Sequence, residues 1–275
     1  MPNDQGMDDI EFEKFAIGQP VSRLEDPMLL RGDGIYTDDI NLDGQAYAYV
    51  LRSPFAHGHI RKLDVNAAAM SDGVLCVLTA KELVAAGVNP LNCRNNMESR
   101  DGSPIIKPDR PCLATEKVRF RGEAVALIVA ESLAQAKDAS ELIEFDVDVL
   151  MAVTDARASL ADGAPQLHDA APNNRALDWE IGNPEEMERI LSDAHHVTRL
   201  NLRNNRVAIS PIEPRAAVGE YDAASERFTL HVPTKGVFGF TTELSERILC
   251  IPREKLRIKT NRVGGSFGMK SAPYP

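Results

Sequence analysis

The sequence Val118-Arg-Phe-Arg-Gly-Glu-Ala-Val-Ala-Leu-Ile-Val-Ala130 is the clearest strand pattern in the chain, and it is interrupted at Gly122. Ser132 follows it and predicts the N-cap of an alanine-rich helix that runs to about Glu141. Residues Phe145 to Val149 alternate between apolar and polar side chains, as a further strand does. The order strand, helix, strand predicts helices packed on a sheet, which is a mixed α/β fold of the α+β class.

The segments before this stretch predict two more strands and a helix. Ala46–Arg52 and Gly73–Thr79 have strand character, and Ala80–Ala86 predicts a helix that Gly87 closes. Residues 88–116 are rich in Pro, Asn and Arg and predict a long irregular loop. Loops of that length are often functional or disordered.

The second half of the chain predicts a separate unit. Residues 154–182 lose periodicity, and Asn183 with Pro184 predicts the start of a helix that reaches about Asp193. Further patterns predict strands at 197–203, 216–221, 227–232 and 255–260 and a helix from Phe238 to Cys250. We therefore predict a flexible tail over residues 1–16, a first domain over 17–154, a connector over 155–182 and a second domain over 183–275.

Composition excludes several classes of partner. The chain has 275 residues, 43% apolar and 26% charged, with a net charge of −10. These shares are typical of a globular protein, and the negative charge argues against a nucleic-acid surface. No run approaches the roughly 20 apolar residues of a membrane span, and the acidic first residues are unlike a signal peptide. We expect a cytoplasmic protein with no nucleic-acid or membrane partner.

The cysteines and histidines do not form a metal-binding pattern. Cys76, Cys93, Cys112 and Cys250 lie far apart in the sequence, which argues against a zinc ribbon or an iron–sulfur cluster within this chain. Cys76 and Cys250 stand in apolar runs and are predicted to be buried thiols. His57 and His59 lack further ligands nearby, so we expect them to bond to backbone groups instead.

The segment Asn261–Lys270 is the main candidate site. Gly264, Gly265 and Gly268 allow positive φ and a close backbone approach, so successive N–H groups can converge on an anion or a metal-oxo group. Phe267 adds an apolar group, and Lys270 could hold a phosphate. Its spacing fits neither a P-loop nor a dinucleotide fingerprint. An ordinary glycine-rich turn is the alternative reading of this segment taken by itself.

Four motifs together resemble the large, molybdopterin-binding subunit of the xanthine dehydrogenase, aldehyde oxidase and carbon monoxide dehydrogenase family. They lie in this order along the chain: Arg23–Pro27 with Leu30–Ile40 and Leu51–His57, then Val118–Ala126, then Asn205–Arg215, then Val263–Lys270. The resemblance implies a hammerhead-like N-terminal domain followed by the first part of a molybdenum-cofactor domain.

The resemblance also implies an oxidoreductase chemistry and its cofactors. Members of this family hydroxylate an electron-poor carbon, such as that of an aldehyde or an N-heterocycle, with oxygen from water. It implies molybdopterin in its cytosine dinucleotide form, with FAD and 2Fe–2S clusters on partner subunits. The implied partners are an iron–sulfur subunit, an FAD subunit and a polypeptide that carries the rest of the molybdopterin domain. The family's catalytic Glu would lie downstream, so no catalytic residue is predicted here and this chain alone is expected to be inactive.

The resemblance assigns the cofactor-binding residues and exposes two departures. The residues implied at the cofactor are Lys235, Gly264, Gly265, Ser266, Phe267 and Gly268. Lys235 stands where the family usually has Gln, and Ser266 stands where it has a third glycine. Glu213 and Arg215 are candidate substrate-proximal residues, with a surface ion pair as the alternative. Lys235 also leaves open a second hypothesis, a non-catalytic assembly module derived from this family.

Overall fold

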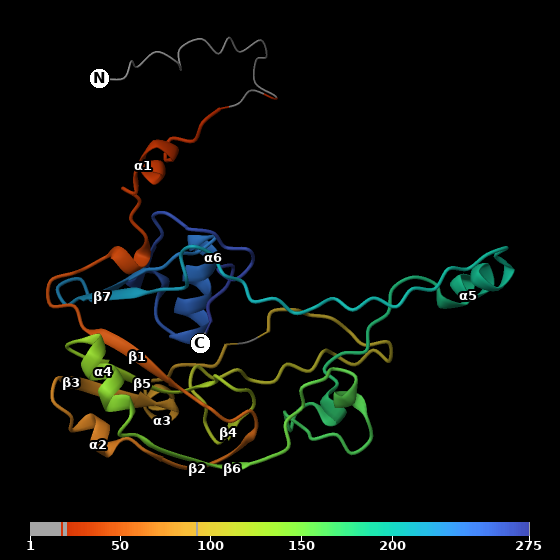
Figure 1. The fold of residues 1–275 in the computed structure, drawn as a ribbon, viewed down its shortest axis with the longest axis horizontal. Coiled ribbons are helices and arrows are strands. Elements are labelled where there is room, and N and C mark those ends of the chain that lie inside the picture. Colours follow the sequence, from red (N-terminus) through yellow and green to blue (C-terminus); the bar gives the residue numbers. More distant parts are fainter. Residues whose placement is uncertain (1–17, 19–20, 92, 275) are drawn as a thin grey trace.

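The computed structural model describes residue 18, residues 21–91 and residues 93–274. The tail predicted over residues 1–16 lies outside these residues. Two three-stranded sheets form the N-terminal half, and a third sheet with a helix forms the C-terminal body (Figure 1). The fold is therefore the predicted mixture of helix and sheet.

The first sheet is antiparallel and has the strand order β1–β5–β3. Its strands are β1 (Tyr47–Arg52), β5 (Ala124–Ala130) and β3 (Val74–Thr79), which confirms three of the predicted strands. Helix α3 (Ala80–Ala85) begins directly after β3, and Thr79 caps it. Helix α4 (Leu133–Ser140) begins after Ser132, whose hydroxyl accepts a hydrogen bond from the N–H of Gln135.

The second sheet has the order β4–β2–β6 and is also antiparallel. It is formed by β4 (Lys117–Val118), β2 (Gly58–Asp64) and β6 (Glu144–Val149). The chain turns at Gly122, where φ is +92°, so the two halves of the stretch 118–130 enter different sheets. Strand β2 was not predicted, because its sequence does not alternate between apolar and polar residues. It has only two apolar side chains, Ile60 and Leu63, with Arg and Lys between them.

The core of this half lies on both faces of β5. Ala126, Ile128 and Ala130 pack with α4 and with α2 (Asn66–Ala69) on one side. Val125 packs on the other side with Val118 and Val147 of the second sheet. Burial on both faces explains why residues 124–130 are apolar throughout instead of alternating.

The C-terminal body contains the sheet β7–β8–β9. Strands β7 (Val218–Asp222) and β8 (Arg227–His231) form the predicted hairpin, and β9 (Leu256–Lys259) pairs parallel to β8. The crossover between them is α6 (Val237–Thr242), which continues as a π-helical segment, η4 (Glu243–Ile248). The predicted helix is thus confirmed in position, but its second half is wound as a π-helix, and η5 (Arg253–Lys255) leads into β9.

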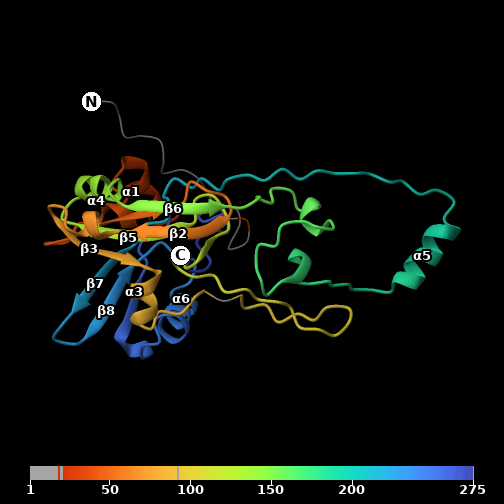
Figure 2. The same ribbon diagram turned by 90° about the horizontal axis from the view of Figure 1, so that it is seen from below.

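A long excursion leaves the body between β6 and β7 and carries α5 (Pro184–Asp193) at its tip (Figures 1 and 2). Two short 3-10 turns, η2 (Ala158–Leu160) and η3 (Pro172–Asn174), lie on its first arm. The strand predicted at 197–203 is wrong: the second arm is extended but pairs with no strand among the described residues. Period-two alternation predicts an extended backbone, whereas a strand also needs a partner for its N–H and C=O groups.

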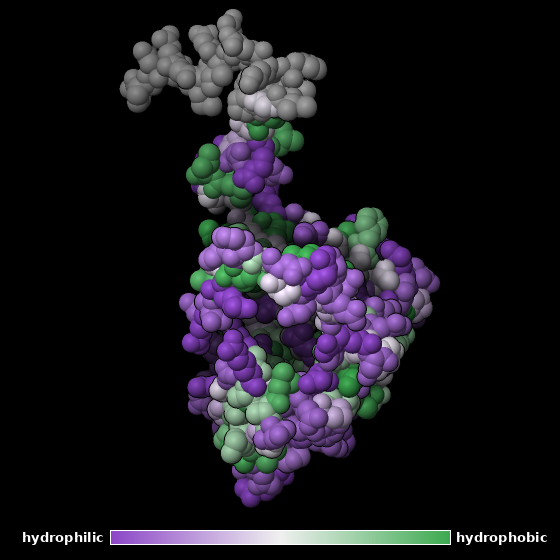
Figure 3. Space-filling model, turned by 90° about the vertical axis from the view of Figure 1, so that its right-hand side faces the viewer, coloured by the Kyte–Doolittle hydropathy of each residue, from purple (hydrophilic) through white to green (hydrophobic). Residues whose placement is uncertain are grey.

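The remaining short elements are α1 (Asp26–Arg31) and η1 (Thr37–Asp39) near the N-terminus. Seen from the side of α5, the molecular surface is hollowed at its centre and framed mostly by hydrophilic residues (Figure 3). Within the described ranges, the helices are all too short or too polar to cross a membrane.

The prediction that Cys76 and Cys250 are buried is wrong. Both thiols are exposed, as is that of Cys93, and only Cys112 is partly covered. Cys76 lies on the edge strand β3 at a position facing away from the core, where an apolar sequence run does not imply burial.

Candidate functional site

The glycine loop over residues 261–270 begins immediately after β9 and folds back on the segment before β7. The carbonyl of Gly264 accepts a hydrogen bond from the N–H of Glu213 at 3.1 Å. A Cβ atom on Gly264 would lie 2.6 Å from the Cβ of Glu213, so only glycine permits this approach. Gly265 has φ of +91°, and a Cβ there would meet the ring of Phe267 at 2.9 Å and Pro211 at 3.2 Å.

A buried ion pair fastens this loop. The ammonium of Lys270 lies 2.8 Å from Oε2 of Glu213, and the two side chains are 0% and 1% exposed. The same ammonium donates to the main-chain carbonyl of Glu213 at 2.7 Å. Oε2 also accepts from the N–H of Gly264 at 2.8 Å, and Oε1 accepts from the N–H of Thr37 at 3.1 Å. Glu213 therefore ties together the N-terminal segment, the glycine loop and Lys270.

The charge state of Glu213 follows from these contacts. Burial opposes ionisation of its carboxyl group, but the hydrogen bonds from Lys270, Gly264 and Thr37 outweigh it and hold the pKa below the ordinary value. The expectation that Lys270 holds a phosphate is therefore wrong, because its ammonium is enclosed and already bonded to Glu213. The sequence does not indicate this pairing, because 56 residues separate the two side chains in the chain.

Lys235 lies next to the end of the glycine loop. Its N–H donates to the carbonyl of Lys270 at 3.1 Å, while the Thr234 hydroxyl lies 3.4 Å from the same carbonyl. The Lys235 side chain is exposed and lines a shallow cavity. The cavity's other lining residues are Arg94, Gly236, Gly239, Phe240, Ser271 and Pro273. Arg94, which sequence reasoning missed, reaches this cavity from the long loop before β4, and its guanidinium forms an ion pair with the buried carboxylate of Glu243.

The tip of the loop carries polar groups without partners. Among the described residues, nothing accepts a hydrogen bond from the N–H groups of Gly265, Ser266, Phe267 and Gly268. The Ser266 hydroxyl is buried and likewise has no partner there. Phe267 is 76% exposed with φ of +46°, and a Cβ on Gly268 would meet open space. Successive N–H groups without a described partner suit an anionic ligand.

Glu213 and Arg215 lie in different surroundings and do not contact each other. Glu213 is enclosed by the contacts above, and the described part of the chain holds no ion pair between it and Arg215. The guanidinium of Arg215 instead stacks on the ring of Tyr274, 4.0 Å from its centroid. The surface ion pair considered as an alternative is therefore absent within the described residues.

The expectation that histidines bond to backbone groups is confirmed only for His57. Its buried ring has Nδ1 2.9 Å from the carbonyl of Met151, whereas Nε2 has no partner among the described residues. The exposed ring of His59 forms no hydrogen bond with any described residue. No cluster of His, Cys, Asp and Glu able to hold a metal ion occurs in the part of the chain that the structure describes.

Two family profiles match successive parts of the chain. Residues 31–150 match the a/b hammerhead domain of aldehyde oxidase and xanthine dehydrogenase, and residues 167–275 match the molybdopterin cofactor-binding domain. These two matches define the class of the protein by its domains: a hammerhead domain followed by a molybdopterin cofactor-binding domain. The chain belongs to the xanthine dehydrogenase and aldehyde oxidase family, together with the carbon monoxide dehydrogenase large chains.

Individual relatives agree with this assignment. The nicotine 6-hydroxylase large subunit of Paenarthrobacter nicotinovorans is 33% identical over 94% of this chain, and the match covers 31% of that relative. The carbon monoxide dehydrogenase large chain of Afipia carboxidovorans is 31% identical over 94% of this chain and 32% of its own length. The chain thus spans about a third of the length of these curated relatives.

Solved structures share the fold. The crystal structure of quinoline 2-oxidoreductase from Pseudomonas putida 86 superposes with a TM-score of 0.79 at 30% identity, covering 91% of this chain and 31% of that one. The Cu,Mo-CO dehydrogenase gives the same TM-score of 0.79 at 28% identity.

Proposed function

We propose that this chain forms one wall of a molybdopterin site in a molybdenum hydroxylase. The observation that carries the proposal is the glycine loop: its N–H groups at residues 265–268 have no acceptor among the described residues, while Glu213 and Lys270 hold its base in place. Free donors on a fixed backbone suit a bound anionic cofactor, because they need no reorganisation when it binds. The orphaned Ser266 hydroxyl adds a donor at the same place.

Different residues of this chain would have different roles at that site. The N–H groups of Ser266, Phe267 and Gly268 would hold the cofactor, and the exposed ring of Phe267 would cover one apolar side of it. Lys235 would place a positive charge next to the loop, where a Gln would offer only a neutral amide. Glu213 would act indirectly, because it positions the backbone of Gly264 and is itself enclosed.

Bound molybdopterin would supply the metal that carries out hydroxylation with water-derived oxygen. The substrate we propose is an aldehyde, an N-heterocycle or a similar electron-poor carbon compound, since relatives are named for nicotine, nicotinate and aldehydes. We further propose the cytosine dinucleotide form of the cofactor, and partners that carry FAD and 2Fe–2S clusters. Relatives named as large chains or as subunits of a complex support a multisubunit assembly.

We also propose that sequence beyond the matched third of these relatives, on this or on a partner polypeptide, completes the cofactor domain. In the relative named nicotinate dehydrogenase large molybdopterin subunit, from Eubacterium barkeri, the match covers 56% of the relative, a larger share than in the other relatives cited above. That name supports a molybdopterin-carrying subunit that works with other subunits. The competing hypothesis is an assembly module without cofactor, for which the observation is that Lys235 stands where the family usually has Gln.

The test is the molybdenum content of the complex reconstituted with partner polypeptides. Gly265→Val should abolish cofactor retention, because a branched side chain is strained at φ of +91° and meets Phe267 and Pro211. Gly219→Val is the matched control, since Gly219 lies on strand β7 with open space around its Cβ position. Lys235→Gln should leave retention largely intact and change the redox behaviour of the metal.

Two outcomes would contradict the proposal. Equal molybdenum content in wild type and Gly265→Val would remove the glycine loop from the cofactor site. A complex that assembles normally and never contains molybdenum would favour the assembly module.

A further inference from the structure

Three arginine side chains line one cavity between the N-terminal sheets and the segment before β7. Arg52 ends β1, Arg110 comes from the long loop before β4, and Arg215 follows Glu213. The cavity has a volume of about 220 Å³. Its other lining residues are Pro111, Cys112, Phe120, Glu123, Ala124 and Tyr274.

Neighbouring groups hold these guanidinium groups without occupying all their donors. The guanidinium carbons of Arg215 and Arg110 lie 4.0 Å and 5.2 Å from the centroid of the Tyr274 ring, within the range of a cation–π interaction. Arg52 donates one hydrogen bond, of 2.9 Å, to the carbonyl of Gly122. Each guanidinium has five N–H donors, so most of them have no acceptor among the described residues and can bind a ligand.

The cavity is positively charged although the chain as a whole carries a net charge of −10. None of the three arginines forms an ion pair with a carboxylate anywhere in residues 21–91 and 93–274. Glu123 is the one carboxyl group of the lining, and its Oε2 accepts a hydrogen bond from the N–H of Arg119 at 2.6 Å. Burial raises the pKa of Glu123, against the opposing effect of that hydrogen bond. Among the described residues that line the cavity, three cations therefore stand against at most one negative charge.

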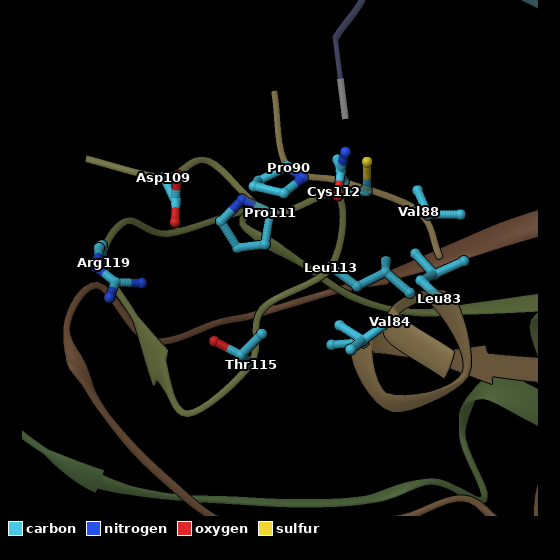
Figure 4. A pocket seen from close by; sticks show the side chains of 12 residues that line it. Leu83, Val84, Val88, Pro90, Asp109, Pro111, Cys112, Leu113, Thr115 and Arg119 are labelled. Carbon is cyan, nitrogen blue, oxygen red and sulfur yellow. The ribbon is translucent and has the colours of Figure 1, made fainter. Parts of the chain in front are cut away.

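An apolar cavity of about 250 Å³ adjoins this cavity, and Pro111 and Cys112 line both. Leu83 and Val84 of helix α3 and Leu113 of the long loop form its apolar side, while Arg119 and Asp109 lie at the opposite end beyond Pro111 (Figure 4). The pair of cavities thus presents an apolar compartment next to a cationic one.

We propose that these adjoining cavities bind a small molecule with a carboxylate on an apolar body. The carboxylate pairs with Arg110 and Arg215, whose planar guanidinium groups match its two oxygens. The apolar body lies against Pro111 and extends toward the apolar compartment. This site is distinct from the glycine loop, and the proposal does not rest on the cofactor assignment.

The test is isothermal titration calorimetry of the full chain at low ionic strength with benzoate, acetate, benzamide and inorganic phosphate. Benzoate should bind at millimolar concentrations and more tightly than acetate or phosphate, because only benzoate combines a carboxylate with an apolar body. Arg110→Gln and Arg215→Gln should each weaken benzoate binding about tenfold. Arg203→Gln removes the same charge from an exposed position on the extended arm and should change nothing.

Specific results would overturn the proposal. Binding of benzamide as strong as that of benzoate would exclude the arginines as the recognition element. Loss of affinity in Arg203→Gln equal to that in Arg110→Gln would show a general charge effect. Absence of benzoate binding, or binding of phosphate alone, would also refute it. If one arginine variant fails to fold by circular dichroism, the other and Arg52→Gln still decide the outcome.

Discussion

Replacing Lys270 by Met should destabilise the protein strongly, because it removes the partner of a buried carboxylate. The Lys270 ammonium makes contacts of 2.8 Å and 2.7 Å with the carboxylate and the carbonyl of Glu213. Both side chains are buried, so water cannot replace the lost partner. Breaking a buried pair on one side typically costs about 3–5 kcal/mol. The backbone N–H groups of Gly264 and Thr37 still bond the carboxylate, so we expect a loss of about 3 kcal/mol.

The measurement is the free energy of unfolding from urea titrations at pH 7. Lys255→Met is the matched control, because Lys255 and Glu226 form an ion pair with side chains that are 34% and 73% exposed. A surface pair of this kind contributes about 0–1 kcal/mol. In the double variant that combines Glu213→Gln with Lys270→Met, the loss of unfolding free energy should be smaller than the sum of the losses in the two single variants by about 1–3 kcal/mol.

The effect should also depend on pH with a definite sign. The pKa of Glu213 is lower in the folded state than the ordinary value of 4.5, so ionisation of this group stabilises the fold above that value. The stabilisation is lost as the pH falls from about 4.5 through the lower folded-state pKa. The cost of Lys270→Met should therefore shrink in acid. Equal losses in Lys270→Met and Lys255→Met at pH 7 would refute the assignment of a buried, stabilising pair.

Two further predictions concern exposed parts of the chain. Trypsin should cut first at Arg199, Arg203 or Arg206 on the second arm of the excursion. Residues 194–209 are exposed almost throughout and make no backbone hydrogen bond to any described residue. First cleavage within Val118–Ala130 would contradict this prediction. Titration with Ellman's reagent should show three fast thiols and one slow thiol, because Cys112 is partly covered and burial raises its pKa whereas the other three cysteines are exposed. The variant Cys76→Ser should lack one of the three fast thiols. If it lacks the slow thiol instead, Cys76 is not exposed and the edge position of β3 is contradicted.

Local patterns in the sequence determined much of the secondary structure. Ser132 and Asn183 fix the starts of α4 and α5 because a side-chain oxygen next to a free N–H group is a purely local interaction. The glycines at 264 and 265 likewise predicted a loop of close approach, since a Cβ at either position would meet a neighbouring group and Gly265 also has positive φ. The domain boundary at 155–182 remains a prediction.

Only the tertiary structure determines which side chains interact with each other. Nothing local in the sequence shows that Lys270 pairs with Glu213, that Glu213 also bonds Thr37, or that Arg215 stacks on Tyr274. The pattern at 197–203 suggested a strand because alternation fixes which way side chains point, but it cannot supply a neighbouring backbone to bond. Charge and apolar character are properties of single residues, whereas burial and pairing depend on which distant segments the fold brings into contact.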